Sequence, residues 1–312
     1  MTNSLFNVLV LDGGGSKGIY TLGVLNELEL KLGVPLYQHF DLIYGTSTGS
    51  IIGSLLALGV EVAEIKKLYI ENIPEIMNVR GRKRKSKKLQ ELGEKVFRKK
   101  DFTDFKTDIG IVALNYDTQN PLVFKSNLNQ AHGMKHSFIP GFGCTISNAV
   151  QSSCSAYPIF AKKQLQTLNQ GKINVVDGGY IANNATLFAL IDSHKAYKVD
   201  KKNIRLLSVG TGNFIEKSMG GLLSLFNKFK LYQFIQKIIT SNTNTNVILA
   251  KLLYSDIKMV RINNTYNKPE YGTNMLERDM EKLELLFRLG RSSYAQAESE
   301  IDNLLQQDKP LI

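Results

Sequence analysis

Short, nearly continuous apolar runs predict buried strands in the first half of the chain, and glycine-rich turns follow the early ones. The first run covers 7–11 and leads into Asp12 and three glycines, after which apolar residues recur at helical spacing up to Leu30. A second strand–turn–helix unit covers 40–59. Apolar runs without polar alternation suit strands that are covered on both faces. We therefore expect a buried sheet built from such units.

The remaining chain continues this alternation and then becomes mainly helical. Further strands are expected at 109–114, 122–124, 173–176 and 204–209. Further helices are expected at 61–72, 145–153, from near Asn184, 222–239, 245–254, 274–290 and, with a weaker pattern, 293–306. Residues 73–106 suggest an exposed, lid-like insertion, and 126–145 a loop. Alternating strands and helices predict an α/β fold with a mostly parallel central sheet flanked by helices.

Positive charge is concentrated in one segment. Lys and Arg number 39 against 28 Asp and Glu, and the run 80–88 (RGRKRKSKK) holds seven of the basic residues, which leaves 11 − 7 = +4 for the rest of the chain. This run has two open interpretations. It is either a contact for an anionic lipid surface, where each basic side chain contributes roughly 1 kcal/mol, or a solvated loop. Because no aromatic residues are interleaved with it, we expect no nucleic-acid binding.

Composition excludes several classes of protein. A hydrophobic content of 43% with 21% charged residues is ordinary for a globular chain and argues against extensive disorder. Cys144 and Cys154 exclude a disulfide scaffold and offer no C-x-x-C metal spacing. We find no signal-peptide pattern, no apolar run of ~18 residues and no glycine for myristoylation. These features predict a cytoplasmic protein with reduced thiols.

Ser47 is the candidate nucleophile. It occupies the centre of Gly45-Thr46-Ser47-Thr48-Gly49, between an expected strand and an expected helix. A nucleophile elbow requires this G-x-S-x-G pattern in this position, because the sharp turn raises the serine hydroxyl above the sheet. Gly45 and Gly49 would let the strand and helix pass closely, and the helix N-terminus favours developing negative charge. The alternative is an ordinary helix cap.

The glycine cluster after the first strand is the candidate oxyanion hole. It reads DGGGSKG, and its members are Gly13, Gly14, Gly15, Lys17 and Gly18. Backbone N–H groups exposed by glycines can bind an oxyanion. Gly13, Gly15 and Gly18 also satisfy G-x-G-x-x-G, the dinucleotide-binding spacing. That alternative is disfavoured, because Asp41 begins a strand where the motif needs an acidic residue that ends one.

Asp177 is the candidate general base, and it is followed by Gly178 and Gly179. It ends an expected strand, and ligands in open α/β sheets bind beyond the carboxyl ends of strands. We therefore expect Asp177 to meet Ser47 at one edge of the sheet, unless Asp-Gly merely forms a turn. None of the histidines clearly follows a strand, so no triad is expected; they are His39, His132, His136 and His194. No third ligand accompanies His132 and His136, so no metal site is expected.

Three motifs in this order, DGGGSKG, GTSTG and DGG, resemble the patatin-like phospholipase family. The resemblance implies a three-layer fold in a single catalytic domain spanning 1–312, with core motifs in 7–195 and a helical part from about 213. It implies that Ser47 is the nucleophile, Asp177 the base and the glycine cluster the oxyanion hole, without a metal or cofactor. Lys17 stands where Arg is commoner, which keeps the charge and loses the guanidinium fork. The implied reaction is hydrolysis of phospholipid esters.

The chain also resembles the phospholipase effectors of cyclic-oligonucleotide anti-phage defence. This resemblance implies a cyclic oligonucleotide activator and a protein that contacts the inner face of the membrane when active. The apolar segment 222–239 could serve internal packing, contact between copies in a homo-oligomer, or lipid contact. Two alternatives to the phospholipase are an esterase or thioesterase acting on soluble acyl substrates and a non-catalytic lipid- or nucleotide-binding module.

Overall fold

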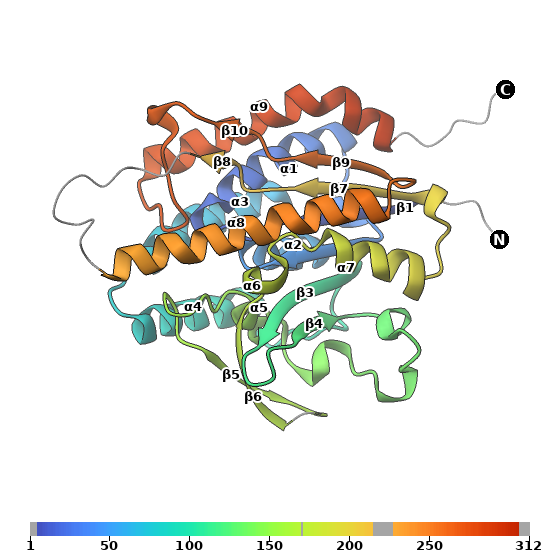
Figure 1. Ribbon diagram of the computed structural model, residues 1–312, viewed down its shortest axis with the longest axis horizontal. Coiled ribbons are helices and arrows are strands. Elements are labelled where there is room, and N and C mark those ends of the chain that lie inside the picture. Colours follow the sequence, from blue (N-terminus) through green and yellow to red (C-terminus); the bar gives the residue numbers. More distant parts are fainter. Residues whose placement is uncertain (1–4, 170, 215–226, 306–312) are drawn as a thin grey trace.

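A central sheet of eight strands organises the part of the chain that the computed structural model describes, which is 5–169, 171–214 and 227–305 (Figure 1). The strand order is β5-β6-β3-β2-β1-β7-β9, and β4 pairs with β3 beside this path. The sheet contains β1 (Phe6–Leu11), β2 (Leu42–Thr46), β3 (Asp108–Asn115), β4 (Pro121–Lys125), β5 (Lys163–Thr167), β6 (Gly171–Asp177), β7 (Ile204–Val209) and β9 (Lys258–Ile262). A separate two-stranded sheet pairs β8 (Asn213–Phe214) with β10 (Thr265–Tyr266).

The five strands β3, β2, β1, β7 and β9 are parallel, which confirms the mostly parallel sheet. β4, β5 and β6 run antiparallel to their neighbours. β6 overlaps β3 only where Asp177, Val176 and Val175 pair with 113–115. Asp177 therefore reaches the carboxyl edge of the parallel strands from the opposite direction. Asp177 ends a strand, as expected, and that strand runs antiparallel to β3.

Alternate residues of β1 face two separate hydrophobic cores, so the sheet is covered on both faces. Leu9 and Leu11 belong to the larger core, and Val8 and Val10 to the smaller one. The helices of the larger core are α1 (Gly18–Leu32), α2 (Thr48–Ala57), α3 (Val62–Asn78), α4 (Arg82–Phe97), α5 (Ile146–Ser153) and α9 (Met280–Leu305). Those of the smaller core are α6 (Gly179–Ala182), α7 (Thr186–Ile191) and α8 (Asn227–Leu253), and α8 crosses in front of the sheet in Figure 1.

The basic run lies in a packed helix rather than in a lid-like insertion. α3 continues to Asn78, and α4 begins at Arg82, within the run. Leu89, Gly93 and Phe97 are buried on one face of α4, which packs against α5. The buried residues in the second half of α4 therefore hold its basic first half against the fold. The prediction of an exposed, lid-like insertion over 73–106 is wrong.

The C-terminal part contains fewer, longer helices than expected, together with strands. α8 is continuous through the polar stretch 240–244, which suggested an interruption. In this stretch Thr243 donates to the Ile239 carbonyl and Asn242 donates to the Ile181 carbonyl of α6, so these two polar side chains are paired inside the fold. α9 is likewise one helix from 280 to 305. Residues 222–226, where the first of these helices was expected to begin, lie outside the described part of the chain.

β5, β9 and the small strands β8 and β10 were not predicted. β5 is short, and its sequence KQLQT alternates exposed polar residues with buried ones. β9 adds an outer parallel strand to the sheet beside β7, so the C-terminal part is not purely helical. In the described residues no helix is long and apolar enough to cross a bilayer.

Candidate active site

Ser47 lies at a strained turn between β2 and α2. Its φ of 52° and ψ of −123° place a non-glycine residue in a sparsely populated backbone region, as a nucleophile elbow requires. A Cβ at Gly45 would lie 2.3 Å from the Gly49 carbonyl oxygen, and one at Gly49 would lie 2.2 Å from the Leu11 carbonyl oxygen. Both flanking glycines are therefore required by close backbone contacts.

The structure brings Ser47 and Asp177 into direct contact. Ser47 Oγ donates to Asp177 Oδ2 at 2.7 Å, and the Gly179 amide donates to Asp177 Oδ1 at 2.7 Å. Burial raises the pKa of Asp177 to about 6, and the two hydrogen bonds oppose this shift. A Cβ at Gly178 would lie 2.2 Å from the Val112 carbonyl oxygen, so the turn after the base also needs glycine. Asp177 is a stronger base than an ordinary aspartate and remains largely ionised at neutral pH.

Two backbone amides of the glycine loop after β1 find no acceptor within the described part of the chain. The Gly13 amide donates to the Asn183 carbonyl, the Lys17 amide to the Gly14 carbonyl, and the Gly18 amide to the Gly15 and Ser16 carbonyls. The amides of Gly14 and Gly15 donate to no group in the described residues. Both residues line the same pocket as Ser47. Two free N–H groups beside a nucleophile are suited to bind an oxyanion.

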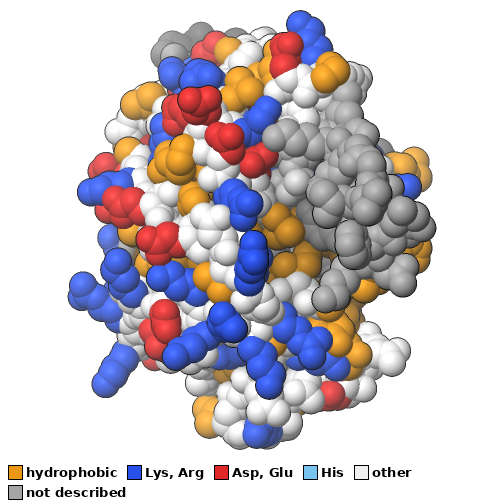
Figure 2. All heavy atoms as spheres, turned by 90° about the vertical axis from the view of Figure 1, so that its left-hand side faces the viewer, with side chains coloured by type: hydrophobic (Ala, Val, Ile, Leu, Met, Phe, Trp, Pro, Cys, Tyr) orange, Lys and Arg blue, Asp and Glu red, His pale blue; other side chains and the backbone are white. Residues whose placement is uncertain are grey.

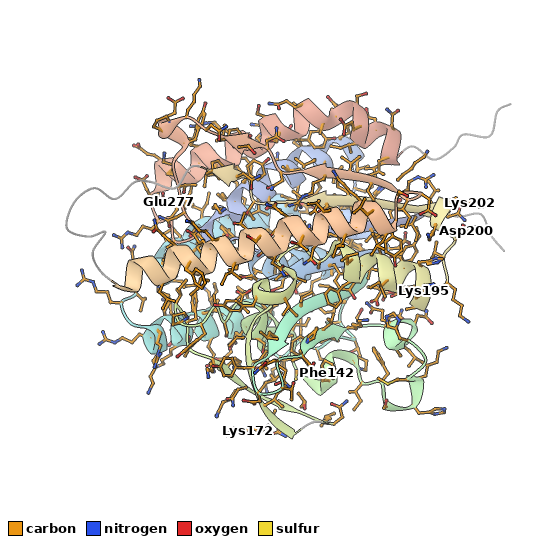
Figure 3. The ribbon with its side chains drawn as sticks, in the orientation of Figure 1. Phe142, Lys172, Lys195, Asp200, Lys202 and Glu277 are labelled. Carbon is orange, nitrogen blue, oxygen red and sulfur yellow. The ribbon has the colours of Figure 1, made fainter. Side chains whose placement is uncertain are left out.

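The shape of this loop also depends on glycine. Gly15 has a φ of +57°, and a Cβ there would lie 2.2 Å from the Met275 carbonyl oxygen. A Cβ at Gly14 would meet the Thr211 side chain at 2.4 Å. The glycine loop is thus held between Thr211, just after β7, and Met275, in the segment before α9. This contact with the C-terminal part of the chain was not expected from the sequence. Figure 3 shows Glu277 in that segment, and Glu277 accepts the amides of Arg278 and Asp279.

An ion pair fixes the start of the glycine loop. Both oxygens of buried Asp12 are paired with Arg261 of β9, at 2.9 Å from Nη1 and 2.5 Å from Nη2. Asn184 Nδ2 also donates to Asp12, at 2.7 Å. Sequence reasoning missed Arg261, Asn183 and Asn184 as contributors to the site. The one sequence signal was the position of Asp12 directly before the glycines, because a carboxylate at the end of a buried strand needs a cationic or hydrogen-bonding partner.

The pocket around Ser47 combines polar and apolar walls. It has a volume of about 100 Å³. Met77, Ile159, Phe160 and Leu276 form apolar parts of its lining, while the inner face of α8 contributes Gln236, Ile239, Thr240, Thr243 and Asn244. On the outer face of the same helix, Leu231, Phe234 and Ile238 are exposed. Of the segment 222–239 proposed from the sequence for packing, copy contact or lipid contact, the described side chains from Leu231 onward therefore have one face in the pocket and one in solvent.

No histidine lines this pocket. His132 Nε2 lies 2.6 Å from Asp192 Oδ1, in a buried network with Lys125 that is separate from the Ser47 pocket. The described residues contain no group of acidic, histidine and cysteine side chains that could hold a metal. Cys154 lines the pocket but is buried, and burial raises the pKa of its thiol. In the described residues, the Ser47 hydroxyl therefore contacts a carboxylate and not an imidazole.

Comparison with known proteins agrees with this geometry. Residues 9–190 match the family described as Patatin-like phospholipase. The chain is 45% identical over 303 residues to a cUMP-AMP-activated phospholipase of Escherichia coli, covering 97% of this chain and 95% of the relative. It is 30% identical over 219 residues to a cGAMP-activated phospholipase of Pseudomonas aeruginosa, covering 66% of this chain and 62% of the relative.

Solved structures share the architecture at low sequence identity. VipD from Legionella pneumophila aligns with a TM-score of 0.54 at 12% identity, covering 96% of this chain and 67% of that one. Human GIVD cytosolic phospholipase A2 aligns with a TM-score of 0.52 at 10% identity, covering 97% of this chain and 60% of that one. These structures share the α/β fold of this chain. The chain belongs to the patatin-like phospholipase family and is a hydrolase of lipid esters.

Proposed function

We propose that the chain is a phospholipase A-type enzyme that cleaves membrane phospholipids with a Ser47–Asp177 dyad. The observation that carries this proposal is the 2.7 Å hydrogen bond from Ser47 Oγ to Asp177 Oδ2, in a pocket that also exposes the free amides of Gly14 and Gly15. Nucleophile, base and oxyanion donors are the three groups that acyl transfer needs.

The mechanism has two steps. Asp177 accepts the hydroxyl proton while Ser47 Oγ attacks the ester carbonyl, and the amides of Gly14 and Gly15 stabilise the oxyanion. Asp177 then gives the proton to the leaving lysophospholipid alcohol as the acyl-enzyme forms. In the second step Asp177 takes a proton from water, the hydroxide attacks the acyl-enzyme, and the proton returns to Ser47 as the fatty acid leaves. Each oxyanion donor contributes about 10²–10³ in rate in comparable sites.

The substrate lies in a bilayer, so the pocket needs a membrane contact. Leu231, Phe234 and Ile238 have exposed fractions of 47%, 60% and 40% and lie on the helix whose inner face lines the pocket. The charged residues within α8 are all lysines, which suits an anionic lipid surface. We therefore assign the outer face of α8 as the surface that meets the membrane when the enzyme is active.

Regulation by a cyclic dinucleotide completes the proposal. The relative that covers 97% of this chain is named for activation by cUMP-AMP, and two-thirds of the chain matches a relative named for activation by cGAMP. A lipid hydrolase inside a cell needs such control, because its substrate is the cell's own membrane. An activator made only when required would confine hydrolysis to that time, as in defence against phage.

The test is fatty acid release from mixed phospholipid vesicles, measured by mass spectrometry with and without cyclic UMP-AMP. Ser47→Ala and Asp177→Asn should both abolish nucleotide-dependent release. Ser137→Ala and Asp200→Asn are matched controls on exposed residues, and Figure 3 shows Asp200 at the right-hand end of the molecule. Cleavage of soluble esters with no release from vesicles would instead support an esterase. Release that survives in Ser47→Ala would overturn the dyad.

A further inference from the structure

A hollow of about 670 Å³ lies between α4 and the β5–β6 hairpin, separate from the Ser47 pocket. Four lysines line it: Lys83 and Lys87 from the basic run on α4, and Lys162 and Lys163 from the start of β5. Its lining contains no acidic residue. Figure 2 shows Lys and Arg side chains gathered on the lower half of this side of the molecule. The volume is typical of pockets that bind small ligands, which span about 300–1,000 Å³.

Acidic side chains lie near these ammonium groups without forming close pairs: Asp117 acts on Lys162, and Glu94 on Lys163, through space alone. Lys162 Nζ lies 3.3 Å from the centre of the Tyr116 ring, and Lys163 Nζ donates to the neutral Gln151 amide at 2.8 Å. Burial lowers the pKa of Lys163. Lys83, Lys162 and Lys163 form no ion pair with the described residues, and Lys87 approaches Glu91 only at 3.9 Å. An anion in the hollow would supply the close pairing that the protein does not.

The neutral part of the lining suits a nucleotide rather than a bare anion. Gln90, Gln164 and Asn174 line the hollow beside the lysines. Gln90 donates to Glu94 and Asn174 donates to Asp117, so these two side chains offer a ligand mainly their carbonyl oxygens, whereas Gln164 offers donors and an acceptor. Such groups can pair with the edges of purine and pyrimidine bases. Lysines for phosphodiesters together with amides for bases match the two chemical parts of a cyclic dinucleotide.

One chain segment separates this hollow from the catalytic pocket. In the segment 155–163, Ala156, Ile159 and Phe160 line the catalytic pocket, whereas Ser155 and 161–163 line the hollow. The Ser155 carbonyl accepts the amide of Asp177 at 3.1 Å. At the other end, the Ala161 amide donates to Ser86 Oγ of α4 at 2.8 Å. A ligand that draws Lys162 and Lys163 toward α4 would therefore act on the wall of the catalytic pocket and on the backbone of the base.

We propose that this hollow is the binding site for a cyclic dinucleotide and that 155–163 couples its occupancy to the Ser47 pocket. This inference rests on the cyclic-dinucleotide activation proposed above. It adds where the nucleotide binds and how its binding reaches the Ser47 pocket. Lys83, Lys87, Lys162 and Lys163 pair with the two phosphodiesters, and the neighbouring amides contact the bases. The basic run is then a ligand wall rather than a membrane contact.

The first experiment measures binding of cyclic UMP-AMP by calorimetry to the full chain carrying Ser47→Ala, so that catalysis plays no part. Lys162→Gln with Lys163→Gln, and separately Lys83→Gln, should each weaken the affinity about 10-fold or more, a free-energy change of about 1.4 kcal/mol. Lys83 is exposed, so its substitution leaves the fold intact. Lys172→Gln is the matched control: Figure 3 shows Lys172 at the tip of the same hairpin, and it does not line the hollow.

The outcomes separate this proposal from the broader one. No binding of cyclic UMP-AMP to the unsubstituted chain would overturn dinucleotide activation itself. Binding that survives in both hollow variants would overturn the location and leave activation standing. Loss of affinity for anionic vesicles without loss of nucleotide binding would make the hollow a lipid-headgroup site. For the coupling, Ser86→Ala is assayed at saturating cyclic UMP-AMP, because Ser86 itself lines the hollow. Nucleotide-stimulated fatty acid release should fall even at saturation, and full stimulation in this variant would refute the proposed route.

Discussion

Arg261 and Asp12 form a doubly bonded ion pair that links β9 to the residue immediately before the glycine loop. Asp12 is 3% exposed and Arg261 15% exposed at the side chain, so the pair is shielded from water. Breaking one partner of a buried pair leaves an uncompensated charge, which costs about 3–5 kcal/mol. The pair therefore joins the stability of the fold to the position of the oxyanion donors.

Arg261→Ala should lower the free energy of unfolding by about 3–5 kcal/mol, measured by urea denaturation. Arg291→Ala is the control, because Arg291 pairs with Glu27 at the surface, with its side chain 51% exposed. Exposed pairs contribute only about 0–1 kcal/mol. The double variant Asp12→Asn with Arg261→Gln should recover part of the loss. Equal effects of Arg261→Ala and Arg291→Ala would contradict the importance of the buried pair.

Hydrolysis should decline as the pH falls through about 6, because Asp177 has a pKa of about 6 and its protonated form cannot accept the Ser47 proton. The measurement is the pH profile of kcat/KM on a soluble ester, which avoids changes in vesicle charge. An acidic limb near pH 4, where an ordinary aspartate titrates, would show that burial does not control the base.

The same raised pKa makes Asp177 costly to the fold at high pH. The folded state holds the proton more tightly than the unfolded chain, where the pKa is 3.8, so the contribution of Asp177 to stability is most favourable below pH 4 and is lost as the pH rises through about 6. Asp177→Asn should therefore raise the Tm at pH 8 and raise it less at pH 5. A Tm difference that does not change between these pH values would argue against this assignment.

Gly15→Ala should reduce hydrolysis by about 10²-fold or more, since the loop must shift away from the Met275 carbonyl and an oxyanion donor would move with it. Gly33→Ala provides a comparison at a similar positive φ of +68°, where a Cβ meets nothing within 4 Å. That substitution should cost about 1 kcal/mol of stability and leave the rate unchanged. Both variants are assayed for kcat/KM and Tm. Wild-type activity in Gly15→Ala would remove this loop from the oxyanion hole.

Leu231→Ser should weaken binding to anionic vesicles by about 10-fold, because a leucine that enters the lipid interface contributes about 1.5 kcal/mol or more. Its rate on a soluble ester should stay unchanged, since its side chain does not line the pocket. Leu128→Ser is a close control: Leu128 has the same exposed fraction, 47%, but lies outside α8. Vesicle sedimentation measures both variants. Equal losses for the two would show that α8 has no special role at the membrane.

The turns that carry the candidate catalytic groups could be predicted from the sequence, because each is formed by residues that are adjacent in the chain. Ser47 and the glycines around it form a contiguous motif whose backbone requirements are visible in the residue types. The contacts of Arg261 with Asp12 and of Asn183 with Gly13 could not be predicted, because they join residues 249 and 170 positions apart. No spacing rule relates such positions, and only the folded sheet brings them together.

The misassigned elements have a common physical cause. Ser, Thr and Asn favour caps and turns, so 240–244 suggested a break in α8. In the fold, Asn242 and Thr243 instead bond to α6 or to their own helix, and Thr243 and Asn244 line the catalytic pocket. The polar residues of 240–244 thus reflect the position of α8 beside the catalytic pocket and not a break in the helix. β5 was missed because one face of a hairpin strand is solvated, which removes the apolar run.

The ion pair between Asp12 and Arg261 also has a consequence for protein synthesis. The glycine loop leaves the ribosome well before Arg261, which follows Asp12 by 249 residues. A nascent chain that has not yet exposed β9 lacks the group that holds Asp12. It also lacks the segment around Met275 that accepts the Ser16 amide and closes over Gly15. An incomplete chain that ends before β9 therefore lacks both contacts that fix the oxyanion loop in the folded protein.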